Sequence, residues 1–400
     1  MNTTLGTPVK TNKSAGFFLK VCQLCYLFGF PNCWMESLKF SKTFTKIYDP
    51  FSKLTNVMIY LFILTEWGSM FTQNNLTEKQ RSDRIMFCLS HPVLCSYRVI
   101  LAYHREKLQE LMYNLCLVLK EKVNDEEIEK GMVRKALAYT SALVGLCSTS
   151  LFLYGADGFN QMMRSEATFT TVITAWPLVE DTSISASAAR FFLYFMWWVF
   201  MSRVFGAFAM LISLIVALEH QYKNLGKYFR NLSGIFEQDL SQAQKEKEYD
   251  QSVKYGIKLH AKTLRCTRLA QDSFSSIFRA QILLNTYVLV LLMFQMVSSE
   301  RTLANVLAVI ATGFAMLLST GFLMWTGGDI TVEAAILPTD MYCSGWHNCR
   351  SATGTRKLLA LAMLQGQKPV MIKGLGFITI SYPAYLSIVK SAYSVFSVLY

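Results

Sequence analysis

Long apolar stretches alternate with short polar ones along most of this 400-residue chain. Each apolar stretch has about 20 residues, the length of helix that crosses a bilayer core roughly 30 Å thick. Hydrophobic residues make up 52% of the chain and charged residues only 16%, whereas soluble proteins carry about 25% charged residues. The pattern predicts an all-α membrane protein with seven transmembrane helices in a single domain, residues 1–400. Six uninterrupted spans are predicted at residues 51–72, 84–103, 136–155, 191–218, 276–297 and 303–325.

The seventh span is predicted to be a broken helix. It begins near residue 357, is interrupted by GQKPVMIKG at residues 366–374, and resumes from residue 378 to 400. Pro369 cannot continue the helical hydrogen-bond ladder. Because irregular backbone at membrane depth is tolerated only against protein or a water-filled cavity, we expect the break to lie inside the bundle.

The distribution of positive charge predicts the orientation. The net charge is +12, but Lys and Arg lie between the apolar stretches and form no single basic stripe, which argues against a nucleic-acid partner. The polar segments on the N-terminal side of the predicted membrane hold 27 of the 39 Lys and Arg residues, and those on the other side hold 6. By the positive-inside rule the N-terminus is cytosolic. Asn75 then heads an Asn-Leu-Thr sequon in the first extracellular loop, where it is a glycosylation candidate.

Two charged segments also carry a helical apolar repeat. They are residues 104–135 and 219–275. We expect both to be cytosolic extensions of the spanning helices.

The residues that would indicate enzyme chemistry are missing. The chain has no HExxH pattern, no GxSxG elbow, no P-loop and no dinucleotide-binding glycine motif. We therefore expect no catalytic site and no cofactor. Cys22 and Cys25, and the group Cys343, His347 and Cys349, each fall short of the four ligands of a structural zinc site, so no metal site is predicted. A transporter is disfavoured because no inverted repeat is visible.

A ligand pocket is predicted in the outer halves of the second, third and fourth spans. Apolar and aromatic side chains occur there with a few hydroxyls, the mixture that suits a small, mostly apolar ligand. For any single residue, ordinary core packing is the competing interpretation. The candidate ligand-binding residues are Phe87, His91, Ser150, Tyr154, Phe195, Met201 and Phe205.

The last span carries the candidate pore residues. Ser391 and Ser394 lie at helical spacing and form a small polar stripe, and the bulkier Phe396 and Tyr400 follow on another face. This arrangement suits a pore with a hydrophobic gate that closes by dewetting. The competing interpretation is that small serines allow close helix packing.

The C-terminal third resembles the insect odorant receptor family. The resemblance lies in the following motifs: YCSGW at residues 342–346, TRKLLALAMLQGQKP at 355–369, Lys373 with Gly374, and YLSIVKSAYSVFSVL at 385–399. Ala392 departs from the family's usual ending, in which a Ser precedes Tyr-Ser-x-Phe. Trp176-Pro177 and the stretch at residues 218–232 are also similar to family segments.

This resemblance implies an odorant-gated, non-selective cation channel of four subunits in the plasma membrane of an olfactory sensory neuron dendrite. The chain looks like a ligand-tuning subunit that joins a co-receptor, because it lacks the co-receptor's long cytosolic insertion between helices four and five. The resemblance also implies an intersubunit anchor near residues 328–364 and a gate at Phe396 and Tyr400. A small volatile odorant and membrane lipid are the further expected partners.

Two other receptor classes remain as alternatives. The related gustatory receptors share the fold and end in a different Tyr-centred motif. A G-protein-coupled receptor would place its N-terminus outside the cell, against the charge distribution.

Overall fold

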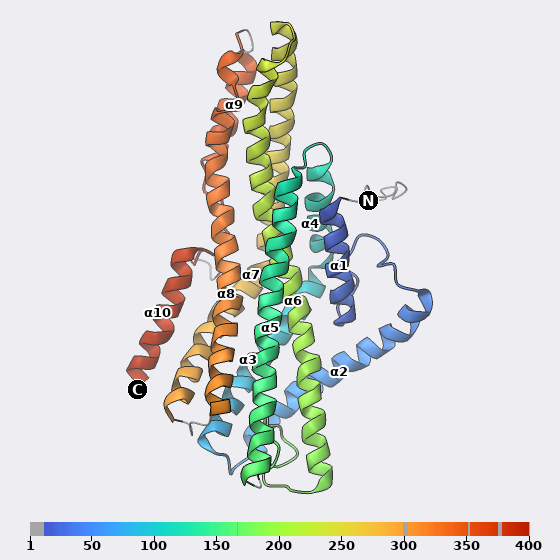
Figure 1. The fold of residues 1–400 in the computed structure, drawn as a ribbon, viewed down its shortest axis with the longest axis vertical. Coiled ribbons are helices and arrows are strands. Elements are labelled where there is room, and N and C mark those ends of the chain that lie inside the picture. Colours follow the sequence, from blue (N-terminus) through green and yellow to red (C-terminus); the bar gives the residue numbers. More distant parts are fainter. Residues whose placement is uncertain (1–11, 166, 299–302, 351–352, 375–377, 400) are drawn as a thin grey trace.

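The computed structural model describes residues 12–165, 167–298, 303–350, 353–374 and 378–399. These residues form helices and connecting loops, and their one strand-like pairing is an isolated bridge between Lys373 and Thr379. The long helices run side by side along one axis, while α2 crosses them obliquely (Figure 1). The helices are α1 (Lys13–Leu27), α2 (Lys42–Thr72), α3 (Glu78–Tyr103), α4 (Arg105–Cys116), α5 (Glu126–Ser165), α6 (Ile184–Asn231), α7 (Gln242–Ser298), α8 (Leu303–Tyr342), α9 (Thr353–Gly366) and α10 (Tyr382–Leu399), with short 3₁₀ turns η1 (Val118–Lys120), η2 (Leu232–Glu237) and η3 (Trp346–Asn348).

The predicted all-α membrane architecture is confirmed. Six helices of the described chain, α2, α3, α5, α6, α7 and α8, are long and apolar enough to cross a membrane. The apolar α10 supplies the second half of the predicted seventh span. Each of the six predicted spans lies within one of these longer helices.

Helix α6 is the centre of the bundle. It packs against α5, α7 and α8 as well as α1 and α3, and every residue from Val204 to Tyr222 is buried. A helix that is apolar on all sides is stable only when neighbours surround it. This explains why residues 191–218 form the most hydrophobic stretch of the sequence.

Local signals set several helix starts. Ser41 and Ser183 accept hydrogen bonds from backbone N–H groups in the first turns of α2 and α6. Thr77 and Gln80 form a reciprocal capping box at the start of α3. Such caps satisfy N–H groups that have no partner within the helix.

Helix α1 is a short amphipathic helix that the sequence analysis did not predict. Phe18, Cys22 and Cys25 lie on its buried face, and the helix packs against α4, α5 and α6. The Cys22 thiol contacts the Met112 sulfur at 3.7 Å, and the Cys25 thiol donates to the Gly206 carbonyl at 3.3 Å. Both thiols therefore serve as small packing groups in α1.

The two charged segments contain more breaks than expected. Residues 104–135 hold α4 as a separate helix, because the chain turns at His104 after α3 ends. In residues 219–275 the continuation of α6 ends at Asn231, and α7 starts at Gln242. Helix α9 packs against α8 and α7, at the end of the bundle opposite the loop that joins α2 to α3 (Figure 1). It lies within the predicted anchor region.

The break in the seventh span begins at the predicted residue, Gly366, but extends to the start of α10 at Tyr382. The expectation of a break inside the bundle is met only in part: Lys368 and Pro369 are exposed, whereas Ile372, Gly374 and Ile380 are buried. The α7 side chain Gln271 satisfies this irregular backbone, because its amide donates to the Lys373 carbonyl at 2.9 Å and accepts from the Lys373 N–H at 2.6 Å.

Candidate ligand-binding cavity

A cavity lies between α3, α5, α6, α7 and α8, on the side of the bundle near the loop that joins α2 to α3. The centre of a water molecule can occupy about 60 Å³ of it. A single water needs roughly 10–15 Å³ by this measure, so the cavity has room for a small molecule. Its lining residues are Met86, Phe87, Ser90, His91, Leu94, Cys147, Ser150, Leu151, Tyr154, Trp197, Met201, Val288, Thr312, Ala315 and Met316.

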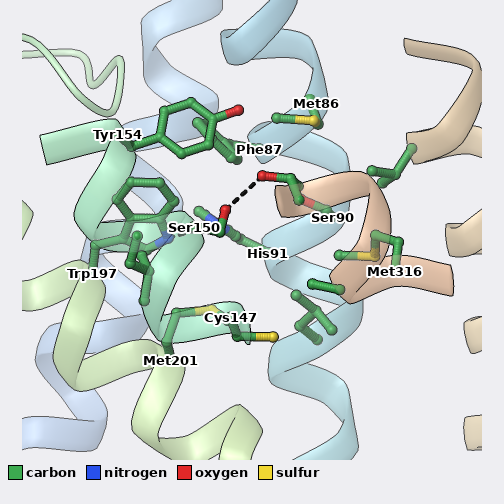
Figure 2. A pocket seen from close by; sticks show the side chains of 15 residues that line it. Met86, Phe87, Ser90, His91, Cys147, Ser150, Tyr154, Trp197, Met201 and Met316 are labelled. Atoms are coloured by element: carbon green, nitrogen blue, oxygen red, sulfur yellow. Dashed lines mark hydrogen bonds between the residues drawn. The ribbon is translucent and has the colours of Figure 1, made fainter. Parts of the chain in front are cut away.

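Helical spacing explains how these residues converge. On α5, Cys147, Ser150 and Tyr154 follow each other at intervals of three and four and therefore share one face. The α3 residues Phe87 and His91 are also one turn apart. Figure 2 shows the side chains of both helices directed into the same space.

One wall of the cavity is aromatic. The Phe87 and His91 rings stack with centroids 5.0 Å apart, and Trp197 meets Phe87 edge-on at 5.0 Å. Tyr154 packs edge-on against Phe87 at 5.7 Å and against Trp197 at 5.6 Å. Such ring pairs contribute about 0.5–1.5 kcal/mol each beyond their burial, so this wall is a rigid surface against which a flat, apolar molecule can pack.

His91 is held by a buried hydrogen-bond chain across three helices. Its Nδ1 lies 2.7 Å from the Glu66 carboxylate on α2, and its Nε2 accepts from the Trp197 indole N–H on α6 at 3.1 Å. Because Nε2 accepts, the proton of a neutral imidazole must be on Nδ1, from which it is donated to Glu66. Glu66 has no exposed surface. His91 therefore offers the cavity a ring face, with both nitrogens already engaged.

The hydroxyls retain hydrogen-bonding capacity. Thr312 donates to the Ala308 carbonyl at 2.8 Å, and Ser150 lies 2.6 Å from the Thr312 hydroxyl. Since Thr312 has one proton, Ser150 donates to it and keeps free lone pairs. The buried Tyr154 hydroxyl makes no hydrogen bond of normal geometry in the described part of the chain. The site thus presents a hydroxyl at Tyr154, close to Asp83 and Thr312, and a free acceptor at Ser150, one helical turn apart.

Five of the seven candidate binding residues line this cavity: Phe87, His91, Ser150, Tyr154 and Met201. The other two do not. Phe195 is 61% exposed on the outer surface of α6, since it lies two residues from Trp197 and so on a different helix face. Phe205 is buried but lies one turn beyond Met201, away from the lining.

Trp197 is the principal lining residue that sequence reasoning missed. All sides of α6 are apolar in this region, so no polar face shows which aromatic residue points inward. The lining residues of α7 and α8, Val288, Thr312, Ala315 and Met316, gave no signal above ordinary core packing.

On α10, the candidate pore residues Ser391 and Ser394 are exposed, whereas Ile388 and Ala392 are buried on a neighbouring face. The Phe396 side chain and all of Tyr400 lie outside the described residues. Asn75 is exposed between α2 and α3, and its amide donates to Glu180 at 2.8 Å.

A polar network connects the cavity helices to the start of α10. Lys135 on α5 lies 2.5 Å from Glu219 on α6 and 2.7 Å from Asp329 on α8. Asp329 also accepts a hydrogen bond from the Tyr382 hydroxyl at the first residue of α10. Lys223 extends the network along α6 through a second contact with Glu219 at 2.7 Å. Ion pairs therefore link three of the helices that form the cavity, and one hydrogen bond joins this network to α10.

Comparison with known proteins decides the family. The sequence matches the profile of the family described as 7tm Odorant receptor over residues 85–393. The chain belongs to the odorant receptor family.

Solved structures support the fold of this odorant receptor. The chain is similar to the olfactory receptor OR5 of the insect Machilis hrabei in complex with eugenol, with a TM-score of 0.78 and 13% identity over 97% of this chain and 99% of that one. It is also similar to a second OR5 structure, with a TM-score of 0.76 and 14% identity over the same shares. No curated protein sequence matches it significantly.

Proposed function

We propose that this receptor is the ligand-tuning subunit of an odorant-gated, non-selective cation channel. It joins a co-receptor in a heterotetramer in the plasma membrane of an olfactory sensory neuron. A small volatile odorant binds in the cavity and opens a pore lined by α10.

The observation that carries this proposal is the cavity itself. It is enclosed mainly by apolar and aromatic side chains, with few hydroxyls, the composition expected of a site for small apolar ligands. No Lys, Arg, Asp or Glu is among its lining residues. The site therefore favours a neutral ligand, and eugenol, the molecule bound by the similar OR5 receptor, is a suitable first probe.

The exposed face of α10 supports the pore assignment. In a helix that packs against α7 and α8 on one side, an exposed stripe containing Ser391 and Ser394 is available to a central pathway between four subunits. Phe396 and Tyr400 remain the proposed gate.

The polar network gives a physical route from ligand to pore. A ligand that binds one arrangement of α5, α6 and α8 better than another shifts the receptor toward that arrangement. Because Lys135, Glu219 and Asp329 lie on those three helices, such a shift changes the contact that Tyr382 makes at the start of α10.

Whole-cell recording tests the proposal. Cells expressing the receptor with an insect co-receptor, and cells expressing either chain alone, are exposed to eugenol and a panel of neutral volatiles. We expect a rapid cation current that requires both chains and persists when G-protein signalling is blocked. A response abolished by that block would overturn the channel assignment.

Matched variants then test the cavity. Replacing Tyr154→Phe removes the hydroxyl while keeping the ring, and should weaken activation by a hydroxyl-bearing agonist about 5- to 10-fold, as expected from the loss of one hydrogen bond. Activation by a ligand of the same shape without an oxygen at that position should change less, because it has no acceptor for the Tyr154 hydroxyl. Phe195→Leu, on the outer surface of α6, is the control and should leave both responses unchanged. Equal losses for all ligands and variants would contradict binding in this cavity.

A further inference from the structure

The first part of α2 separates basic and apolar side chains onto opposite faces. Residues 42–54 read KTFTKIYDPFSKL. At about 100° per residue, Lys42, Lys46 and Lys53 fall within about 40° of one another. The apolar residues, Phe44, Ile47, Phe51 and Leu54, gather on the opposite side.

Both faces are free in the structure. Ile47 is 69% exposed, and Phe51 and Leu54 are each 59% exposed. The three lysines are also exposed. The only acidic residue of the stretch, Asp49, falls within about 60° of the lysines, where it accepts a hydrogen bond from the Tyr26 hydroxyl of α1.

The length of α2 places this segment at the membrane surface. Its 31 residues correspond to about 46 Å of helix, well beyond the roughly 30 Å of a bilayer core. Counting back 20 residues from Thr72 at the opposite end reaches Lys53, so residues 42–52 lie beyond such a span and Lys53 and Leu54 lie at its boundary. Figure 1 shows α2 leaning away from the axis of the other long helices, with its start apart from the bundle.

We propose that residues 42–54 form an in-plane segment that binds anionic lipid head groups of the cytosolic leaflet. The apolar face enters the boundary between head groups and acyl chains, and the three lysines bind the phosphate and carboxylate groups around it. Helices with a basic face opposite an apolar face bind membranes in this way. Each lysine near an anionic surface contributes roughly fivefold in affinity. Hydrogen bonds from Tyr26 and Tyr48 to α2 and α1 then hold α1 to a segment anchored in lipid.

Spin labelling tests the position of the apolar face. Full-length receptor carrying Cys343→Ser, which removes the exposed thiol, receives a single label at Ile47→Cys or, as a control, at Leu240→Cys between η2 and α7. In phosphatidylcholine nanodiscs with one-third phosphatidylserine, we expect the label at position 47 to be relaxed by oxygen and shielded from a water-soluble nickel chelate. The label at position 240 should show the reverse. Nickel access at 47 equal to that at 240, or shielding of 47 from both reagents by a neighbouring subunit, would overturn the proposal.

Native mass spectrometry tests the head-group preference. The variant Lys42→Gln/Lys46→Gln/Lys53→Gln is compared with Lys247→Gln/Lys258→Gln/Lys262→Gln, which removes three exposed lysines from the cytosolic part of α7. We expect the ratio of retained phosphatidylserine to phosphatidylcholine to fall at least tenfold in the α2 variant and to stay unchanged in the α7 control. Equal ratios in the two variants would show that the lysines of α2 recognise no anionic lipid.

Discussion

At the scale of single residues, the cavity depends on side chains that are held in place by hydrogen bonds to one another. Glu66, His91 and Trp197 come from three helices, yet each bond in the chain fixes the next: the carboxylate selects the imidazole tautomer, and that tautomer accepts the indole proton. A buried carboxylate is costly when it has no partner. Glu66 is therefore the residue on which the aromatic wall most depends.

The substitution His91→Phe tests this dependence. It preserves the ring but leaves Glu66 buried without its hydrogen-bond donor, which should lower the free energy of unfolding by about 3–5 kcal/mol. The double variant Glu66→Met/His91→Phe removes the isolated charge and should regain most of the loss. Thermal unfolding of the detergent-purified receptor measures both. A double variant that is no more stable than His91→Phe would show that Glu66 is not the source of the cost.

Sequence reasoning reached four of the nine lining residues on α3 and α5, and on α6 it reached Met201 but not Trp197. Phe87, His91, Ser150 and Tyr154 were predictable because polar and apolar residues mix on those helices, so a polar group within an apolar stretch marks an inward face. Residues 191–218 are apolar on every side, and nothing local distinguishes the inward Trp197 from the outward Phe195. That choice depends on how α6 is rotated by its neighbours, which is a tertiary property.

At the scale of helices, the predicted spans were accurate at their cores and short at their ends. The 20-residue apolar requirement located each membrane segment, but α2, α5 and α7 begin 9 to 34 residues before the predicted spans, in polar sequence. Helix α1 was missed because Met1–Lys20 is polar overall. The spacing of Phe18, Cys22 and Cys25 was the available signal, at four and three residues.

The substitution Tyr382→Phe tests the contact between α8 and α10. The Cβ of any larger residue at Gly327 or Gly328 would lie within 3 Å of Ile380 or Tyr382, so α10 begins directly against α8 and its hydroxyl contact with Asp329 is part of a close fit. Loss of one hydrogen bond, about 0.5–1.5 kcal/mol, should change the half-activating odorant concentration about 2- to 10-fold, with the current in the absence of odorant moving in the opposite sense. Dose–response curves measure both values.

The control for this test is Tyr103→Phe, at the exposed end of α3. A shift no larger than that of the control would mean that the Asp329 contact does not influence gating.

At the scale of the whole molecule, the orientation of the receptor in the membrane is predicted from its charge distribution alone, and this prediction can be tested directly. Cys343 is exposed near the end of α8 that is predicted to be cytosolic, and Asn75 is exposed at the opposite end. A membrane-impermeant maleimide should label Cys343 only after the cells are permeabilised, with Cys343→Ser as the control. Endoglycosidase should increase the gel mobility of the receptor but not that of Asn75→Gln. Labelling of Cys343 in intact cells would reverse the predicted topology.

The interruption of the seventh segment separates α9, in the proposed anchor, from α10, which lines the proposed pore. An unbroken helix carries twist from one end to the other, because each turn is tied to the next by hydrogen bonds. Between α9 and α10 that continuity is interrupted, and the described part of the connection is held by a bridge between Lys373 and Thr379 and by hydrogen bonds between Lys373 and Gln271 of α7. Twist of α10 is therefore not passed to α9 along one continuous helix. We expect substitutions at the proposed anchor and substitutions at the proposed pore to act independently of each other.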